Sequence, residues 1–383
     1  MSDISADSLE QLRLRRSAKW RTFSEDVLPL PVAEMDFPVA APIKEMLIDM
    51  VQRSDMGYGG FIPELGAAFR DYSQTHWNWD VDVDQFRLAT DVGVAGVEVL
   101  RVITQPGDLV VVNSPVYHNF YGWVREAQCE PVDVPLLNRG NGTWDLDFDG
   151  LEQAFAKGAK AYILCNPHNP VGTVFCKEHL EQIAALADQY GVIVISDEIH
   201  APLNYTSTPF VPYLAVNEAA RKNGICITSA SKSWNLAGLK CAQIVTANDD
   251  LKSRLDSLPL AVTWRASLLG AWASLAAYRD GQPWLDSVMK QLHSNRQLVC
   301  DLVTEFIPRA TYFPPESTYL AWIDLNAYGI EDPALMLIDK ARVALNDGKE
   351  FGPDGKNFVR LNFATSPEIL REAFIRMASV LED

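Results

Sequence analysis

The chain has 383 residues, of which 48% are hydrophobic and 22% charged, and its formal net charge is −17. This composition is typical of a soluble globular enzyme and excludes a disordered or fibrous chain. The acidic balance argues against nucleic acid or an anionic membrane as a partner, because both are bound by clustered Lys and Arg. A length prior of about 100–200 residues per domain allows two or three domains, and we expect two.

Six cysteines are scattered along the chain without Cys-x-x-Cys spacing. Several lie inside apolar runs, which predicts buried free thiols in a reducing cytoplasm, with neither a disulfide framework nor a metal site. The N-terminal segment 1–16 is polar, and no segment has the roughly 18 uninterrupted apolar residues of a membrane span. We therefore expect a cytoplasmic protein.

The first part of the chain predicts a short helix over 8–16 and an extended arm over 28–38 that is rich in Pro and apolar residues. Since an apolar arm rarely stands alone, we expect it to pack over a cleft or a partner subunit. A helix over 41–51 precedes the loop Gly57-Tyr58-Gly59-Gly60. Tyr58 is either a simple turn residue or a side chain presented for function.

From residue 86 to residue 246, predicted strands alternate with helices, which is typical of a doubly wound, mostly parallel α/β sheet. The predicted strands are 86–90, 109–113, 161–165, 192–196 and 225–227, and helices are predicted over 65–79 and 178–190. The carboxyl ends of parallel strands meet at one edge of the sheet. We therefore expect the functional site at that edge.

The stretch 228–240 sets Lys232 among small hydroxyl residues directly after a β-branched strand. Small neighbours let a planar ring approach the lysine amine, and Ser hydroxyls with a second cation suit a phosphate dianion. This pattern predicts a Schiff-base site for pyridoxal phosphate (PLP). A surface lysine in a Ser-rich loop is the alternative, because short motifs occur by chance.

Other strand ends test the prediction for Lys232. Tyr117 follows the strand 109–113 and either lies flat on a ring or packs in the core. Asn169 stands in a turn dense in Asn, Pro and Gly and can donate to a phenolic oxygen. Asp197 ends a continuously apolar strand, where a carboxylate needs a positive partner: a protonated pyridine nitrogen or a structural salt bridge. The strand–turn–helix around 91–97 presents backbone N–H groups to a phosphate.

After residue 246 the pattern predicts a helical region over 266–303, strands over 319–324 and 358–362, and a helix over 367–381. Arg360 lies inside an apolar strand and needs an anion, either a substrate α-carboxylate or a structural carboxylate. We expect residues 1–45 to form an N-terminal arm and part of a small domain. A large PLP-binding domain would span 46–265, and linking helices and the C-terminal small domain 266–383.

Together, Asn166-Pro-x-Asn169-Pro-x-Gly172, Asp197-x-x-His200 and Ser229-x-Ser231-Lys232-x-x-Asn235-x-x-Gly238 resemble the motifs of fold-type I PLP enzymes of aminotransferase class I/II. Further segments resemble the MalY/PatB group of C–S β-lyases, often called cystathionine β-lyases: Lys19-Trp20, Val32-Ala33-Glu34-Met35-Asp36-Phe37, Tyr319-Leu-Ala-Trp322-x-Asp324 and Phe358-Val-Arg360-Leu-Asn362. Two positions depart from the pattern, since Pro31 stands where this group usually has Trp and Lys240 where many aminotransferases have Arg.

The resemblance implies a role for each matched residue. Lys232 would bind PLP covalently and remove the Cα proton, and Asp197 would keep the pyridine nitrogen protonated. The other implied PLP contacts are Tyr117 on the ring, Asn169 and His200 at the phenolic oxygen, and the Val94 and Ala95 amides, Ser229, Ser231, Lys240 and Tyr58 of the partner subunit at the phosphate. Arg360 and Ala33 would contact the substrate, and Tyr58 or Tyr117 would protonate the departing sulfur.

The implied protein is a homodimer with active sites at the interface, which cleaves L-cystathionine or related cysteine S-conjugates to a thiol, pyruvate and ammonia, a reaction of methionine biosynthesis. The residues around Lys232 do not separate this lyase from an aminotransferase with the same site. A PLP-binding regulatory protein is a third hypothesis, although no DNA-binding module or basic patch is visible in the chain.

Overall fold

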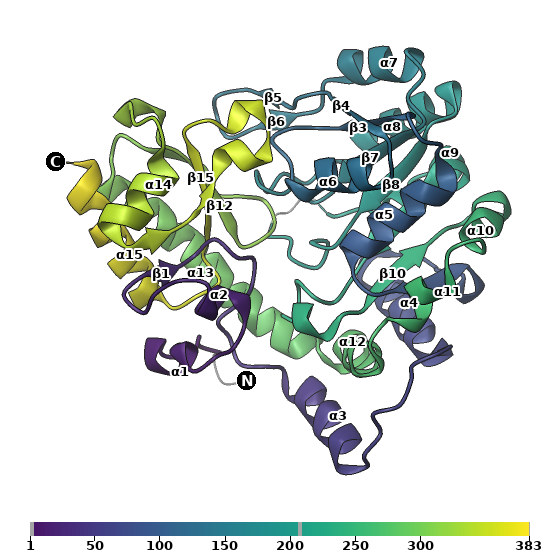
Figure 1. Ribbon diagram of the computed structural model, residues 1–383, viewed down its shortest axis with the longest axis horizontal. Helices are drawn as coiled ribbons and strands as arrows, with labels where there is room; N and C mark the ends of the chain where they lie inside the picture. Colours follow the sequence, from purple (N-terminus) through teal and green to yellow (C-terminus); the bar gives the residue numbers. More distant parts are fainter. Residues whose placement is uncertain (1–3, 206–208, 383) are drawn as a thin grey trace.

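The computed structural model describes residues 4–205 and 209–382, and its centre is a seven-stranded sheet (Figure 1). The strand order is β2 (Phe86–Ala89), β10 (Ala242–Val245), β9 (Gly224–Thr228), β8 (Ile193–Asp197), β7 (Ala161–Cys165), β3 (Leu109–Val112) and β4 (Glu130–Asp133). Strand β10 runs antiparallel to both of its neighbours, and the other strands of this sheet run parallel to one another. The predicted doubly wound, mostly parallel sheet is confirmed.

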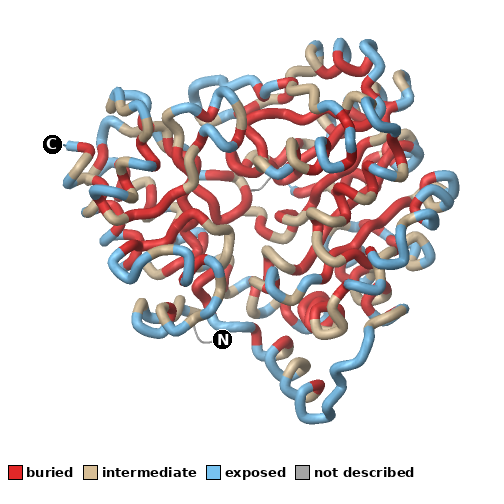
Figure 2. The backbone as a smooth tube through the Cα atoms, in the orientation of Figure 1, coloured by how far each residue is buried: buried red, intermediate tan, exposed pale blue. Residues whose placement is uncertain are grey.

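Helices cover both faces of this sheet, because its strands are apolar on both sides. Val110 and Val112 of β3 belong to the hydrophobic cluster on one face, whereas Val111 points to the other. The first face carries α5 (Val92–Ile103), α6 (Asn119–Glu126), α10 (Asp249–Leu255) and α11 (Leu260–Trp264). The second face carries α4 (Pro63–Trp77), α7 (Phe148–Ala156), α8 (Lys177–Tyr190), α9 (Glu218–Asn223) and α12 (Leu268–Asp280). Figure 2 shows the buried strands between these layers.

A second, antiparallel sheet has the order β11 (Thr311–Tyr312), β12 (Leu320–Asp324), β15 (Phe358–Asn362) and β14 (Asn346–Asp347). It lies with α13 (Gln282–Phe306), α14 (Pro333–Met336) and α15 (Pro367–Leu381) on the side of the molecule that carries the C-terminus (Figure 1). Its core residues are continuous with those on the second face of the large sheet. The small hairpin β5 (Leu137–Asn138) and β6 (Trp144–Asp145) completes the upper edge.

The N-terminal arm packs against the small sheet. Helices α1 (Leu9–Arg13) and α2 (Ala18–Arg21) lead into β1 (Leu28–Pro29), which pairs in parallel with β13 (Val343–Ala344). The Lys19 ammonium and the Asp36 carboxylate form an ion pair at 2.7 Å, both fully buried. Because breaking one half of a buried pair leaves an uncompensated charge, this contact fixes how the arm folds back on itself. The arm then joins α3 (Ala41–Gln52) at the lower edge.

The structure extends the sequence prediction in several places. Strand β8 ends on Asp197 itself, one residue beyond the predicted 192–196, so the acid belongs to the sheet. No strand was predicted at β4, whose Pro131 and two acids read as loop; the structure places it at the sheet edge, where Pro is tolerated. No helix within the described ranges has the length and apolar character that a bilayer crossing requires.

Candidate active site

A cavity of about 480 Å³ lies between the carboxyl edge of the large sheet and the wall formed by the arm and the small sheet. Residues far apart in sequence line it: Pro31, Val32 and Ala33 from the arm, Asp91, Val92 and Gly93 before and within α5, Tyr117, His118, Asn119 and Trp123 after β3, Cys165, Asn169, Asp197, Ile199 and His200 after β7 and β8, Ser229, Ser231, Lys232, Ala237, Lys240 and Cys241 after β9, and Asn346 and Arg360 from the small sheet.

Lys232 reaches this cavity from the turn that follows β9. Its Nζ donates to the backbone oxygen of Ala33 at 3.0 Å, so the amine bridges the large sheet and the arm. Burial and the nearby Arg360 guanidinium lower the pKa of the Lys232 amine to about 8, although Glu34 and Asp197 act in the opposite direction. An amine with this pKa is partly neutral near pH 7 to 8 and can act as nucleophile or base.

Asp197 is a buried acid on the floor of the cavity. Burial raises its pKa to about 7, against the opposing effects of the Ile199 N–H, which donates to Oδ1 at 3.1 Å, and of Lys232. No ion pair within the described residues includes Asp197. The structural salt bridge considered from the sequence is therefore not what this acid makes, and a cation entering the cavity would stabilise its charged form.

His200, which follows β8, and Tyr117, which follows β3, line the same cavity as Asp197. Burial lowers the pKa of His200 to about 3, so the ring is neutral, and its Nδ1 has no hydrogen-bond partner within the described chain. Tyr117 is half-buried, its hydroxyl accepts from Asn119 Nδ2 at 2.6 Å, and burial raises its pKa. A neutral imidazole and an aromatic face thus border the same space.

The helix N-terminus of α5 lies at the end of the cavity that Lys240 and the two serines also line. Lys240 pairs with Asp91 at 2.8 Å, which holds a cation beside the first turn of the helix. Ser229 Oγ donates to the Cys241 carbonyl at 2.6 Å and accepts from the Ser231 N–H at 3.1 Å. A helix N-terminus, hydroxyls and an ammonium form a site suited to a phosphate.

The Val94 and Ala95 amides, which the resemblance assigns to that phosphate, have partners within the helix in this structure. Helix α5 starts at Val92, and its N-cap Asp91 accepts from the Val94 N–H at 2.8 Å through Oδ1 and from the Ala95 N–H at 2.9 Å through its backbone oxygen. Val92 and Gly93, two residues earlier, line the cavity. The sequence did not reveal that Asp91 is the cap.

Arg360 enters the cavity from β15 and is buried. Its partners are neutral oxygens: Asn169 Oδ1 at 3.0 Å, the Pro31 backbone oxygen at 3.0 Å and Asn346 Oδ1 at 2.5 Å. Among the described residues no carboxylate pairs with it, and its Nε has no partner. Burial lowers its pKa to about 10. A buried guanidinium without an anion is a binding site for a carboxylate.

Of the predicted site residues, Ala33 lies at the cavity, whereas Tyr58 lies on the surface of the chain. The Ala33 carbonyl accepts from both Lys232 Nζ and the Tyr319 hydroxyl, the latter at 3.1 Å, so the arm packs over the cleft as predicted. Tyr58 does not line the cavity of its own chain; it is 91% exposed in the segment between α3 and α4. Any contact of Tyr58 with a site requires a second subunit.

Three asparagines contribute to the site without having been assigned a role from the sequence. Asn346 bonds Arg360, and it lies opposite it in the β14–β15 register. Asn362 Nδ2 donates at 2.7 Å to the Val32 and Glu34 carbonyls, and the Asn235 amide makes two bonds of 2.8 Å with the Met35 backbone. Asn235 and Asn362 stand inside the motifs noted above, which was the available signal; Asn346 lies in no motif.

The cysteines of this structure are free thiols. All six cysteines are free, and Cys165 and Cys241 line the cavity. Burial raises the pKa of Cys241 to about 12 and that of Cys165 well above its usual value, which keeps both thiols protonated. Within residues 4–205 and 209–382 no cluster of three or more His, Cys, Asp or Glu has the arrangement of a metal site.

Comparisons with known proteins agree with this geometry. The family profile of aminotransferase class I and II matches residues 25–376. Cystathionine beta-lyase of Corynebacterium glutamicum is 35% identical over 379 residues, which cover 97% of this chain and 99% of that protein. Cystathionine beta-lyase PatB of Bacillus subtilis is 30% identical over 388 residues, covering 99% and 100%. The crystal structure of cystalysin from Treponema denticola, which contains PLP, matches with a TM-score of 0.92 and 28% identity, covering 97% of both chains.

The fold and the cavity define a PLP-dependent enzyme of fold type I. The chain belongs to the aminotransferase class I and II family, and within it to the MalY/PatB-like C–S lyases.

The residues of the cavity fit PLP. The buried Asp197 lacks a cation that a pyridinium nitrogen would supply, and the unpartnered Nδ1 of His200 can meet a polar group of the ring. The α5 N-terminus with Lys240 suits the phosphate, and the half-neutral Lys232 suits the aldehyde.

Proposed function

We propose that this C–S lyase cleaves the Cβ–S bond of L-cystathionine or related cysteine S-conjugates and releases a thiol, pyruvate and ammonia. The observation that carries the proposal is one cavity in which the Lys232 amine, the Asp197 acid and the unpaired Arg360 guanidinium all meet. The relatives named above are described as cystathionine β-lyases, which supports the choice of substrate class. Such an activity would serve methionine biosynthesis in the cytoplasm.

Each polar residue then has a task in the reaction. Arg360 would bind the substrate carboxylate through its guanidinium fork and so orient Cα toward Lys232. The Lys232 amine, partly neutral because burial lowers its pKa to about 8, would accept the Cα proton. Bound PLP supplies the electron sink for the bonding electrons of that C–H bond. Asp197 would keep a positive charge at the ring nitrogen, which strengthens that sink.

The remaining residues would hold the ring and assist the leaving group. Tyr117 would cover one face of the ring, and Asn169 and His200 would border its phenolic oxygen. The phosphate would be held by Ser229, Ser231, Lys240 and the backbone at Val92 and Gly93. Burial raises the pKa of Tyr117, so its hydroxyl keeps its proton and could give it to the departing sulfur. The hydroxyl of the partner's Tyr58 is the alternative proton donor.

We propose that the active form is a homodimer. The long segment between α3 and α4, drawn as an exposed stretch in Figure 2, presents Tyr58 at 91% exposure and Phe61 at 86%. Trp264 and Leu260 of the adjacent α11 are 52% and 77% exposed. Apolar side chains gathered in this way mark an interaction surface, and a second copy covering it would bring Tyr58 to the partner's phosphate site.

We also propose the domain division at residues 45 and 265. Its support is that every strand of the large sheet lies between residues 86 and 245 and every strand of the small sheet between residues 311 and 362.

The test of the proposed function is an assay of PLP-loaded protein with L-cystathionine, read for pyruvate and free thiol without any added oxo acid. We expect equal amounts of the two products. Pyruvate formation that depends on an oxo acid acceptor would instead indicate transamination. Light scattering on the same sample should give twice the mass of one chain, and the monomer mass would contradict the dimer.

A further inference from the structure

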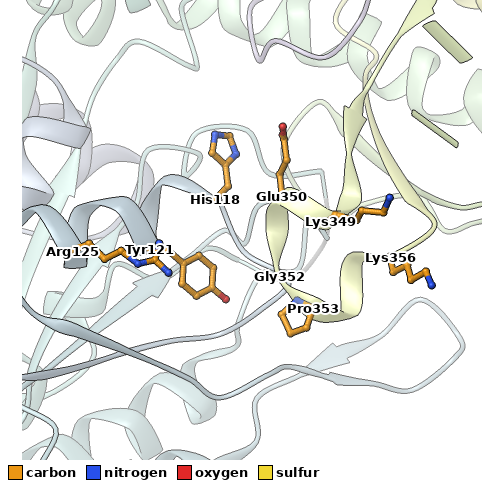
Figure 3. A pocket seen from close by; sticks show the side chains of 8 residues that line it. All are labelled: His118, Tyr121, Arg125, Lys349, Glu350, Gly352, Pro353 and Lys356. Atoms are coloured by element: carbon orange, nitrogen blue, oxygen red, sulfur yellow. The ribbon is translucent and has the colours of Figure 1, made fainter. Parts of the chain in front are cut away.

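A second hollow of about 490 Å³ opens beside the catalytic cavity (Figure 3). One wall is formed by His118 and the α6 residues Tyr121 and Arg125, and the other by Glu350 and its neighbours in the segment 349–356. His118 lines both this hollow and the catalytic cavity. The two spaces are therefore adjacent and share a wall at His118.

The two walls of the hollow are tied together and to the catalytic arginine. The Val116 N–H donates to the Phe351 carbonyl at 2.8 Å, which joins the segment before α6 to the segment beside Glu350. Asn346 accepts from Arg360 at 2.5 Å and donates to Glu350 Oε2 at 3.3 Å. One amide side chain thus separates the Arg360 guanidinium from the Glu350 carboxylate.

The hollow is lined by charged side chains of both signs, and only some of them have an ion-pair partner. Lys349 is paired with Asp332 at 3.1 Å, and in Figure 3 the amines of Lys349 and Lys356 point away from His118. Glu350 and His118 stand side by side and point the same way. Arg125 lies over the Tyr121 ring at 6.0 Å, and no carboxylate of the described chain pairs with it. Glu350 and Arg125 thus both line the hollow, and neither has an ion-pair partner within the described chain.

We propose that this hollow is the subsite for the far end of a two-ended sulfur amino acid, in which Glu350 binds the distal ammonium and Arg125 the distal carboxylate. The inference rests on the proposed lyase function and names its substrate class. The proximal carboxylate binds Arg360, the Cβ–S bond lies near Lys232, and the chain beyond sulfur passes His118. Cysteine conjugates that carry neither a distal ammonium nor a distal carboxylate leave the subsite unused.

The test compares Glu350→Gln and Arg125→Gln in PLP-loaded enzyme on three substrates. These are L-cystathionine, S-carboxymethyl-L-cysteine, which carries only a distal carboxylate, and S-methyl-L-cysteine, which carries neither group. Glutamine at 350 keeps an oxygen for Asn346 and removes only the charge. Glu372→Gln and Arg371→Gln, exposed charges on α15 away from the hollow, are the matched controls.

We expect Glu350→Gln to raise KM for cystathionine about fivefold with kcat unchanged, and to leave KM for the two other substrates within about twofold, as for an exposed charge pair. Arg125→Gln should raise KM for cystathionine and S-carboxymethyl-L-cysteine but not for S-methyl-L-cysteine. Both effects should shrink at high salt, since the groups are exposed.

Equal KM changes on all three substrates, or none on any, would overturn the subsite while turnover continued. If the unmodified enzyme formed no pyruvate from any of them, the proposed function itself would fall, and the subsite with it.

Discussion

The two walls of the cavity are built differently. The wall of the large sheet holds Lys232, Asp197 and Tyr117 at the ends of β9, β8 and β3, each placed by the local geometry of one strand and its turn. The opposite wall joins Pro31 of the arm to Arg360, more than 300 residues later. The first wall faces the proposed cofactor and the second the proposed substrate. Cofactor chemistry is thus tied to a sheet edge, and substrate selection to a long-range assembly.

The largest expected effect on activity comes from a change at Lys232, in the wall of the large sheet. Replacement of Lys232 by Ala should lower turnover at least about 10³-fold, because the variant loses both the covalent anchor and the proton acceptor. The thermal unfolding temperature should change little, since the amine makes one hydrogen bond, to Ala33. The control is Lys222→Ala, an exposed lysine paired with Asp188, which should keep full activity. Substantial pyruvate formation by the Lys232 variant would contradict the proposed role.

A second variant changes Arg360, in the wall formed by the arm and the small sheet. Arg360→Lys keeps the positive charge but loses the planar fork that contacts Asn169, Pro31 and Asn346. We expect KM to rise about 10- to 100-fold, with a smaller fall in kcat, measured by steady-state kinetics. Arg279→Lys, on the exposed end of α12, is the matched control. A change in kcat alone would mean that Arg360 does not bind the carboxylate.

Replacement of Asp197 by Asn should change PLP binding and the stability of the cofactor-free protein in opposite directions. Its folded pKa, about 7, lies above the usual value of 3.8, so the stability gained by holding this proton is lost as pH rises from about 4 through about 7. Asp197→Asn should therefore stabilise the cofactor-free protein by about 1–3 kcal/mol above pH 7. The same change should weaken PLP binding at least about tenfold.

Thermal unfolding between pH 5 and pH 8, with and without PLP, measures both effects of Asp197→Asn. The parent protein without PLP should lose stability across this range, and the variant should lose less. Equal pH dependence in both proteins would mean that Asp197 does not hold the proton.

The smallest expected effect on activity comes from Asn362, which bonds the arm to the small sheet. Asn362→Ala removes two hydrogen bonds to the arm, and Asn295→Ala removes two chemically equivalent bonds to the carbonyls of Phe363 and Thr365, which are not arm residues. Each should cost about 1–3 kcal/mol in denaturant unfolding, because buried carbonyls lose their donors. Only Asn362→Ala should also raise KM, by a few-fold, since only it loosens Pro31 and Ala33. A rise in KM for both variants would indicate general softening of the fold.

Features that depend on neighbours in sequence could be predicted well. Alternating apolar runs identified β7 and β15 with their observed ends, and the strand-end rule brought Lys232, Asp197, Asn169 and Tyr117 to one cavity. The N-cap at Asp91 was missed, because whether an Asp caps a helix depends on where the first turn begins. The amides assigned to the phosphate, those of Val94 and Ala95, lie two residues after Val92 and Gly93, which line the cavity.

The sequence by itself determined the sheet, its apolar layers and the identity of the reactive groups, because local pattern and side-chain chemistry are written residue by residue. Only the tertiary structure decided that Arg360 has no carboxylate partner among the described residues, that Asn235 and Asn362 hold the arm, and that Glu350 lines a hollow beside the cavity. These facts depend on which distant segments meet, and the pattern along a single chain does not encode distances between them. Burial then sets the pKa of Lys232 and Asp197, which no sequence position fixes alone.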